Sequence, residues 1–251
     1  MIVELVGLPG VGKSFLSRCV ERQLAVRRAG GTFFTTYTGE TQSRFPLELT
    51  FKILRATRFV ATHAVTGLAL FAIVRSSRAG LRYRTLTKFV NLLAELDRAS
   101  RTSPATVRVS EQGVLQAIWS LEMLTPESIH RPLMRESERW LPEAIVFVDL
   151  DRERHVRRLR QREKGRSRFD RLSDEELPGE MARGLLEMRA ILLEWRRHLP
   201  DGARLDFSND GDGEADAASI VDWLAGAPHR VPRPSPVAKG EPMDRRSESF
   251  S

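Results

Sequence analysis

Short runs of apolar residues, rich in β-branched and aromatic side chains, alternate along the chain with longer stretches of helical periodicity. This alternation is typical of an α/β fold with a parallel sheet. Because the runs are continuously apolar, we expect strands that are buried on both faces. The sequence predicts a five-stranded sheet with strands at Ile2–Val6, Thr32–Tyr37, Ala105–Val109, Ala144–Val148 and Ala203–Phe207.

Two long helical stretches separate these predicted strands. Residues 41–100 predict a helical insertion, because apolar residues recur every three or four positions. Residues 152–197 predict a helix, a basic loop and a second helix. The chain thus divides into a domain over 1–226 and a tail over 227–251 that we expect to be disordered, since it lacks periodicity. The positions predicted to pack are Phe89, Leu92, Leu93 and Leu96 in the first stretch and Leu185, Leu186, Met188, Leu192, Leu193 and Trp195 in the second.

The most hydrophobic stretch runs from Phe59 to Val74 and is bounded by Arg58 and Arg75. It is shorter than the ~20 residues that a bilayer-spanning helix needs, and it contains His63. We interpret it as a buried helix. The alternative is a helix on a membrane surface or a hairpin insertion.

Composition narrows the class of protein without choosing a reaction. Of 251 residues, 41% are hydrophobic and 29% charged, which is typical of a soluble globular chain. The net charge of +7 favours anionic partners such as nucleotides, nucleic acid or an acidic membrane. Cys19 cannot form an intrachain disulfide, and the five histidines lack zinc-site spacing. With no signal-peptide pattern at the N-terminus, we expect a cytoplasmic protein.

A glycine-rich motif follows the first predicted strand and opens a helix. The sequence Gly-Leu-Pro-Gly-Val-Gly-Lys-Ser matches the Walker A pattern and is here called the phosphate loop (residues 7–14). Its backbone N–H groups and the helix N-terminus would bind ATP phosphates, Lys13 would reach the β- and γ-phosphates, and Ser14 would ligate Mg²⁺. The candidate nucleotide-binding residues are Gly7, Leu8, Pro9, Gly10, Val11, Gly12, Lys13, Ser14 and Phe15.

Two other motifs that would define a class of nucleotide-binding protein are absent: the guanine-reading Asn-Lys-x-Asp and the Leu-Ser-Gly-Gly of ABC ATPases. The remaining expectation is an enzyme that transfers a phosphoryl group to a small acceptor.

The chain resembles phosphate-loop kinases of the nucleoside monophosphate kinase-like superfamily, and thymidylate kinase-like proteins in particular. The resemblance rests on the phosphate loop, on Val146–Asp151, and on the arginine-rich segments 158–162 and 166–171, which include Arg-Phe-Asp. It implies a three-layer α/β/α P-loop NTPase fold, an arginine-rich lid over 152–180, and an ATP- and Mg²⁺-dependent transferase. The implied acceptor is a nucleotide or nucleoside.

Arginines in the lid supply the charge that phosphoryl transfer needs. A closing segment that carries guanidinium groups stabilises the transferring phosphate and excludes water. Arg158, Arg162 and Arg168 are the first choices for this role, ahead of Arg166 and Arg171. The alternative is a solvated basic face or a surface that contacts RNA.

A carboxylate is expected on the strand beside the phosphate loop, to hold the metal or to accept the acceptor's proton. Glu111 is the candidate. Related kinases often have two acidic or charged residues here, whereas this chain has Ser110 before Glu111. That departure leaves direct base catalysis open, and with it a degenerate kinase that binds nucleotide without turnover. Ser110 is alternatively a helix N-cap.

Three further residues bear on the acceptor and on a rival function. Glu40 and Arg44 follow the second predicted strand, where an acceptor would bind, but either is alternatively a loop residue facing water. Asp149 ends a Walker B-like run, which would indicate an ATPase or nucleotide-dependent switch if that strand neighbours the phosphate-loop strand. We expect no specific nucleic-acid partner. A peripheral membrane contact and a homodimer stay open.

Overall fold

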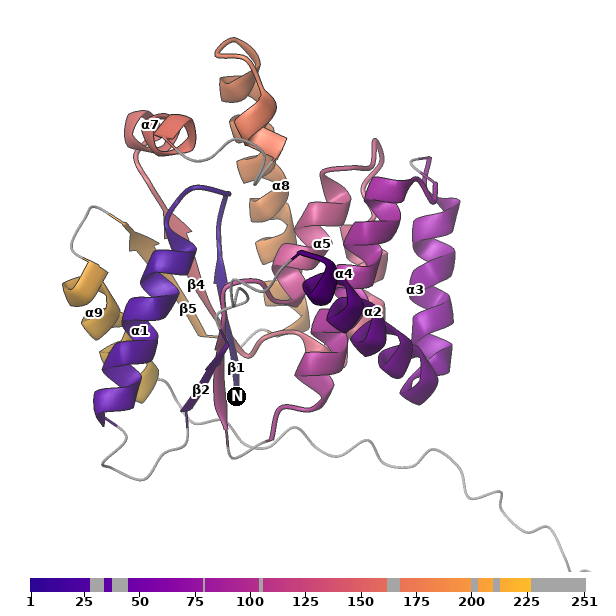
Figure 1. Ribbon diagram of the computed structural model, residues 1–251, viewed down its shortest axis with the longest axis horizontal. Coiled ribbons are helices and arrows are strands. Elements are labelled where there is room, and N and C mark those ends of the chain that lie inside the picture. Colours follow the sequence, from indigo (N-terminus) through magenta and orange to yellow (C-terminus); the bar gives the residue numbers. More distant parts are fainter. Residues whose placement is uncertain are drawn as a thin grey trace, which may run out of the picture.

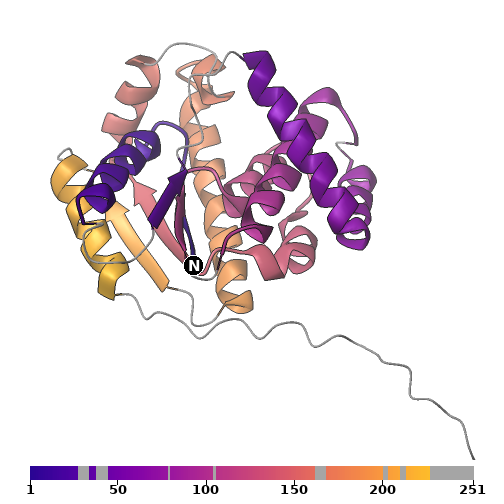
Figure 2. The ribbon, with the colours of Figure 1, turned by 60° about the horizontal axis from the view of Figure 1, so that its bottom comes forward.

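The computed structural model describes residues 1–27, 34–37, 45–78, 80–103, 106–161, 168–199, 203–209 and 213–226. Helices α1 (Lys13–Arg27) and α9 (Gly213–Gly226) cover one face of a parallel sheet, and α5 (Val114–Glu122) and α8 (Glu176–His198) cover the other (Figures 1 and 2). Three further helices lie beyond α5, on the side away from α1: α2 (Phe45–Thr62), α3 (Ala64–Ser76) and α4 (Tyr83–Ser100). The described residues therefore confirm an α/β fold with a parallel sheet and many helices.

The strands are β1 (Ile2–Val6), β2 (Phe34–Tyr37), β3 (Val107–Ser110), β4 (Ala144–Asp149) and β5 (Ala203–Ser208), in the order β2-β3-β1-β4-β5. All four pairings are parallel. The strand that leads into the phosphate loop therefore lies between β3 and β4.

The helices run as follows: α1 Lys13–Arg27, α2 Phe45–Thr62, α3 Ala64–Ser76, α4 Tyr83–Ser100, α5 Val114–Glu122, α6 His130–Ser137, α7 Arg152–Gln161, α8 Glu176–His198 and α9 Gly213–Gly226. Two short 3₁₀ helices, η2 (Glu138–Trp140) and η3 (Arg168–Arg171), precede β4 and α8.

Burial follows the apolar pattern in the central strands. Four of the five side chains of β1 are buried, as are five of the six in β4. In β5 half-buried and exposed residues alternate, so the expectation of burial on both faces is wrong for this strand, which lies at the edge of the sheet. The parallel strands place their carboxyl ends at one edge of the sheet, where ligands bind in α/β folds.

The apolar stretch Phe59–Val74 is not the single buried helix that its composition predicts. The chain breaks at His63, and α2 and α3 meet there with a bend of 117°. The His63 ring packs against Phe59 and Trp140, with centroids 4.9 and 5.1 Å away. Because the bend turns α3, Val65 and Leu68 on α3 are 83% and 64% exposed.

Helix α8 corrects two further packing predictions. Met188, Leu192 and Trp195 are buried, but Leu186 and Leu193 are 68% and 61% exposed. Predicted packed positions in α4 are confirmed, since Phe89, Leu92, Leu93 and Leu96 are all buried. The spacing of apolar residues therefore predicts burial correctly in α4, which lies between two layers. It does not do so in α8, which is covered on one side only.

Candidate active site

The phosphate loop leaves β1 and enters α1 through two glycines with left-handed backbone. Gly10 and Gly12 have φ of 96° and 97°, a region that other residues rarely adopt. A Cβ on Gly10 would lie 2.7 Å from Leu159, and a Cβ on Gly12 would overlap the amide of Asn209. Both glycines are therefore required by conformation and by close approach of neighbouring side chains.

Lys13 lies across its own loop. Its Nζ donates hydrogen bonds to the carbonyls of Gly7 and Leu8, at 2.7 and 3.0 Å. Ser14 and Phe15, the next two residues, are exposed. The ammonium group is thus held near the carbonyls at the start of the loop, and the Ser14 hydroxyl is accessible to a ligand.

Two other loop carbonyls accept hydrogen bonds from distant parts of the chain. His155 Nε2, on α7, lies 2.7 Å from the carbonyl of Pro9. Asn209 Nδ2, after β5, donates to the carbonyl of Val11 at 2.6 Å. Arg158 Nη1 also approaches Val11, at 3.4 Å. The loop is therefore fixed from two sides by buried side chains, which gives it a defined shape before any ligand binds.

The charge state of His155 follows from its surroundings. A carbonyl only accepts, so Nε2 carries the proton in the bond to Pro9. Burial lowers the pKa of the His155 imidazole; the bond to Pro9 opposes this shift, and the charges of Lys13 and Arg158 add to it. The ring is therefore a neutral donor at pH 7, and the positive charge at the loop comes from Lys13 and Arg158.

Glu111 directly follows β3, on one side of the phosphate-loop strand. The register pairs Ser110 with Glu4 of β1. Glu111 therefore lies beside the last residues of β1, which lead into the phosphate loop. Glu111 is 3% exposed, and its Oε2 has no hydrogen-bond partner among the residues that the structure describes. A buried carboxylate oxygen without a donor is costly, and a bound cation would compensate it.

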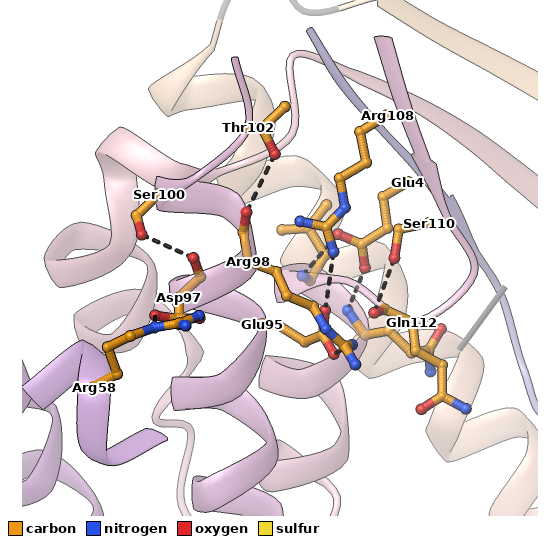
Figure 3. A network of polar contacts seen from close by, with 12 residues as sticks. Glu4, Arg58, Glu95, Asp97, Arg98, Ser100, Thr102, Arg108, Ser110 and Gln112 are labelled. Atoms are coloured by element: carbon orange, nitrogen blue, oxygen red, sulfur yellow. Dashed lines mark hydrogen bonds and ion pairs between the residues drawn. The ribbon is translucent and has the colours of Figure 1, made fainter. Parts of the chain in front are cut away.

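Ser110 does not cap the following helix, so the N-cap interpretation is wrong. Its hydroxyl donates instead to the carbonyl of Gln112, at 3.0 Å. The N-terminus of α5 is capped by the Glu4 carboxylate, which accepts from the N–H groups of Leu115 at 3.1 Å and Gln116 at 2.7 Å (Figure 3). A glycine, Gly113, occupies the N-cap position itself.

The Glu4 side chain is unusual for a charged group in a central strand. Burial raises the pKa of its carboxyl to about 7, against the two N–H donors, which lower it. The carboxylate of Glu95 on α4 raises it further. Glu4 therefore changes its protonation near neutral pH, on the phosphate-loop strand and opposite Ser110, the residue before Glu111.

Asp149 ends β4, on the other side of the phosphate-loop strand. Both β3 and β4 neighbour β1, so strand adjacency alone fits Glu111 and Asp149 equally. The two carboxylates differ in their bonding. Asp149 Oδ1 accepts from the N–H of Leu150 at 2.8 Å, whereas Glu111 Oε2 has no donor. This difference favours Glu111 as the residue that would bind a metal.

The predicted lid is described in part. Arg158 lies on α7 beside the phosphate loop, and Arg168 begins η3. The next residue in η3, Phe169, is buried and stacks on Trp119 of α5, with ring planes 6° apart. Trp119 Nε1 in turn donates to the carbonyl of Gly184 on α8, at 2.8 Å. The Arg-Phe-Asp segment is thus anchored in the core through its aromatic residue.

Several predicted residues lie outside the described part of the chain: Glu40, Arg44, Arg162 and Arg166, together with the side chain of Arg168. In contrast, His155, Asn209 and Glu4 were not predicted from the sequence. Only the position of Asn209, a polar residue directly after the last strand, was a usable signal, because ligand sites gather at the carboxyl ends of parallel strands.

No protein-family model matches the chain, and no curated protein matches it in sequence. Among solved structures it is similar to EHV4-TK complexed with TP4A, with a TM-score of 0.46 and 14% identity over 89% of this chain and 90% of that one. It is also similar to shikimate kinase from Aquifex aeolicus vf5, with a TM-score of 0.42 and 15% identity over 90% of this chain and 97% of that one. We therefore infer the function from the residues of this chain alone.

Proposed function

We propose that the protein is a phosphotransferase that moves the γ-phosphoryl group of ATP to a small-molecule acceptor. The observation that carries the proposal is a phosphate loop of fixed shape after β1, with a buried carboxylate, Glu111, directly after the neighbouring strand β3. Among the described residues, no donor reaches the Oε2 of Glu111. A preorganised set of N–H donors and cations is what phosphoryl transfer needs, because the reaction depends on positioning and on stabilising charge.

The residues present fit Mg²⁺ and a nucleoside triphosphate. Ser14 and Glu111 offer the hard oxygen ligands that Mg²⁺ prefers, directly or through water. When bound, the ion would neutralise charge on the β- and γ-phosphates. Lys13 would exchange its bonds to the carbonyls of Gly7 and Leu8 for phosphate oxygens. Arg158, which approaches the loop at Val11, would add a second cation.

Glu111 also has a role toward the acceptor in this proposal. A buried carboxylate accepts a proton from a hydroxyl that attacks the phosphorus, provided that the acceptor lies within hydrogen-bond reach. We propose a nucleotide or nucleoside as the acceptor, bound near Glu40 and Arg44, with Arg162 and Arg168 closing over the phosphates. A cytoplasmic location would suit these substrates.

A second candidate function is an ATPase or nucleotide-dependent switch. It is favoured by Asp149, which ends a strand next to β1 in the Walker B-like position. The bond of its Oδ1 to the N–H of Leu150 weighs against a metal role, because a carboxylate so engaged has less capacity left for a cation. We therefore prefer phosphoryl transfer.

The proposal is tested by incubating the purified protein with ATP and Mg²⁺ against nucleosides, nucleoside monophosphates, sugars and amino-alcohols, and following products by mass. We expect one class of acceptor to gain a phosphoryl group. Lys13→Ala should lower this rate by about 10³-fold or more, because it removes a cation from the transferring phosphate. Thermal unfolding of the variant checks that it remains folded.

Phosphate release that is independent of any acceptor, and is lost in Lys13→Ala, would favour the ATPase or switch instead. Wild-type rates of product formation in Lys13→Ala would contradict both functions, since each depends on the phosphate loop.

A further inference from the structure

Net positive charge is concentrated in one part of the chain. Residues 45–90 contain eight Lys and Arg and one acidic residue, Glu48, so this segment carries +7. The whole chain also carries +7, which leaves 32 basic and 32 acidic residues elsewhere. The segment comprises α2, α3 and the first half of α4, so the excess charge belongs to the helical block beyond α5.

The same segment holds most of the exposed apolar side chains. Among the described residues, eleven large hydrophobic side chains are exposed, and eight of them lie between residues 51 and 86. The most exposed are Val65 at 83%, Tyr83 at 75% and Leu68 at 64%. We call this set the α2–α4 surface: Phe51, Ile53, Leu54, Val65, Leu68, Leu81, Tyr83 and Leu86, with the exposed Arg75, Arg78, Arg82 and Arg84.

On α3 the exposed apolar residues form a stripe along one side of the helix. On α3, Val65, Leu68 and Ala72 are exposed at spacings of three and four, opposite the buried Gly67, Leu70 and Val74. Helix α3 lies at the edge of the molecule, across the helical block from α1 and α9 (Figure 1). Nothing in the described residues covers this stripe, so it is available to a partner.

The charges of this surface are not explained by stability of the fold. Arg82 is the N-cap residue of α4 and Arg84 lies in its first turn, where positive charge opposes the helix dipole. Positive charge at this end of α4 is unfavourable for the helix, which fits a role of these arginines toward an anionic partner.

No single described helix is long and apolar enough to cross a membrane. Only together do Glu48–Thr62 and Ala64–Ser76 have the length and apolar composition of a membrane span, and they are bent by 117° at their junction. An amphipathic pair of this kind can lie in the plane of a membrane, with apolar side chains among the acyl chains and arginines at the headgroups.

We propose that the α2–α4 surface binds the surface of an anionic lipid bilayer. The exposed Val, Leu, Phe and Tyr side chains fit the acyl-chain region of such a bilayer, and the exposed arginines fit its anionic headgroups. A second copy of the chain fits less well, because a symmetric dimer would bring two such positive surfaces together. Nucleic acid would use the arginines but would leave the aliphatic stripe of α3 without a partner. This proposal is independent of the reaction at the phosphate loop.

The test is sedimentation of the full chain with vesicles of phosphatidylcholine and phosphatidylserine, compared with vesicles of phosphatidylcholine alone. We expect binding to the anionic vesicles that weakens as salt is raised. Leu54→Glu with Leu68→Glu removes exposed apolar groups and should lower the partition about tenfold or more. The same change at Leu186 and Leu193, which are also exposed but lie on α8, is the matched control and should have no effect.

A second pair of variants tests the charge. Arg82→Glu with Arg84→Glu should lower the partition by about tenfold or more, given roughly a fivefold effect for each cation near an anionic surface. Arg189→Glu, exposed on α8, is the control. Both pairs replace exposed side chains, so thermal unfolding should match the wild type.

Three outcomes would overturn the proposal. The first is equal or absent binding to both kinds of vesicle. The second is binding to single-stranded RNA that Arg82→Glu with Arg84→Glu abolishes and Leu54→Glu with Leu68→Glu leaves unchanged, without vesicle binding. The third is a dimer in analytical ultracentrifugation that the leucine variants dissociate, again without vesicle binding.

Discussion

The phosphate loop and helix α4 both contain buried polar groups, but different chemistry satisfies them. Carbonyls of the loop accept from the neutral side chains of His155 and Asn209. In α4, Asp97 binds the guanidinium of Arg58, and Glu95 binds that of Arg98 (Figure 3). The neutral donors His155 and Asn209 hold the loop together with the charged donors Lys13 and Arg158, whereas ion pairs connect the helices of the helical block.

This difference bears on where the protein has positive charge. At the phosphate loop, Lys13 and Arg158 donate to backbone carbonyls, and the neutral groups of His155 and Asn209 add two further bonds. In the helical block, the buried carboxylates of Asp97 and Glu95 form ion pairs with Arg58 and Arg98. Four other arginines of the block are exposed: Arg75, Arg78, Arg82 and Arg84. The protein thus presents positive charge in two separate places, one preorganised within a loop and one spread over exposed helices.

The largest expected effect tests whether Glu111 belongs to the chemistry of the phosphate loop. Glu111→Gln keeps the size of the side chain but removes its charge, so we expect turnover to fall about 10²- to 10³-fold with little change in ATP affinity. Single-turnover kinetics and ATP titration separate the two quantities. Asp149→Asn is the matched variant on the opposite neighbouring strand. A larger loss of turnover in Asp149→Asn would transfer the role to that residue.

The next effect concerns Glu4, which lies where the two regions meet. Its folded pKa of about 7 is above the ordinary value of 4.5, so the folded protein retains a proton that the unfolded chain releases. The contribution of Glu4 to the free energy of unfolding is therefore fully present below pH 4.5 and is lost as pH rises through 7. We expect the free energy of unfolding to fall by about 2 to 3 kcal/mol between pH 5 and pH 8 through Glu4.

Glu4→Gln should remove this pH dependence, because glutamine stays neutral over the whole range. Urea unfolding at a series of pH values measures the slope for both proteins. Glu175→Gln, exposed at the start of α8, should keep the wild-type slope. An identical slope in Glu4→Gln would show that Glu4 does not titrate near neutrality.

The smallest expected effect tests the hydrogen bond from Asn209 to the phosphate loop. Asn209→Asp keeps the shape but replaces the donor with a carboxylate, which leaves the carbonyl of Val11 facing an acceptor. We expect a loss of about 1 to 3 kcal/mol in stability and weaker ATP binding. Asn91→Asp on α4 is the control. If ATP affinity is unchanged while stability falls, Asn209 supports the fold and not the shape of the site.

Local signals in the sequence predicted the strands, the phosphate loop and the buried positions of α4. Each of these depends on neighbours within a few residues. The contacts that define the site do not: His155 and Pro9 are 146 residues apart, and Asn209 and Val11 are 198 apart. Such pairs become visible only when strand order is known, which is why the sequence identified the loop but not what holds it.

The errors have an equally physical origin. Ser110 has the residue type of a helix cap, but Glu4 reaches the same N–H groups from the adjacent strand. The run Phe59–Val74 has the composition of a buried helix, but the chain breaks at His63, and Val65 and Leu68 are exposed on the helix that follows. Composition indicates how apolar a segment is but not where a helix breaks or which side of it is covered.

The position of Lys13 in the structure means that an anion must compete with two internal hydrogen bonds to reach its ammonium group. Its ammonium already holds two internal acceptors, the carbonyls of Gly7 and Leu8, which any incoming anion must displace. A ligand with a single weak charge gains little from that exchange, whereas a polyphosphate supplies several oxygens at once. If the proposed function holds, the lysine would act as an internal competitor that discriminates against inorganic phosphate and other small anions.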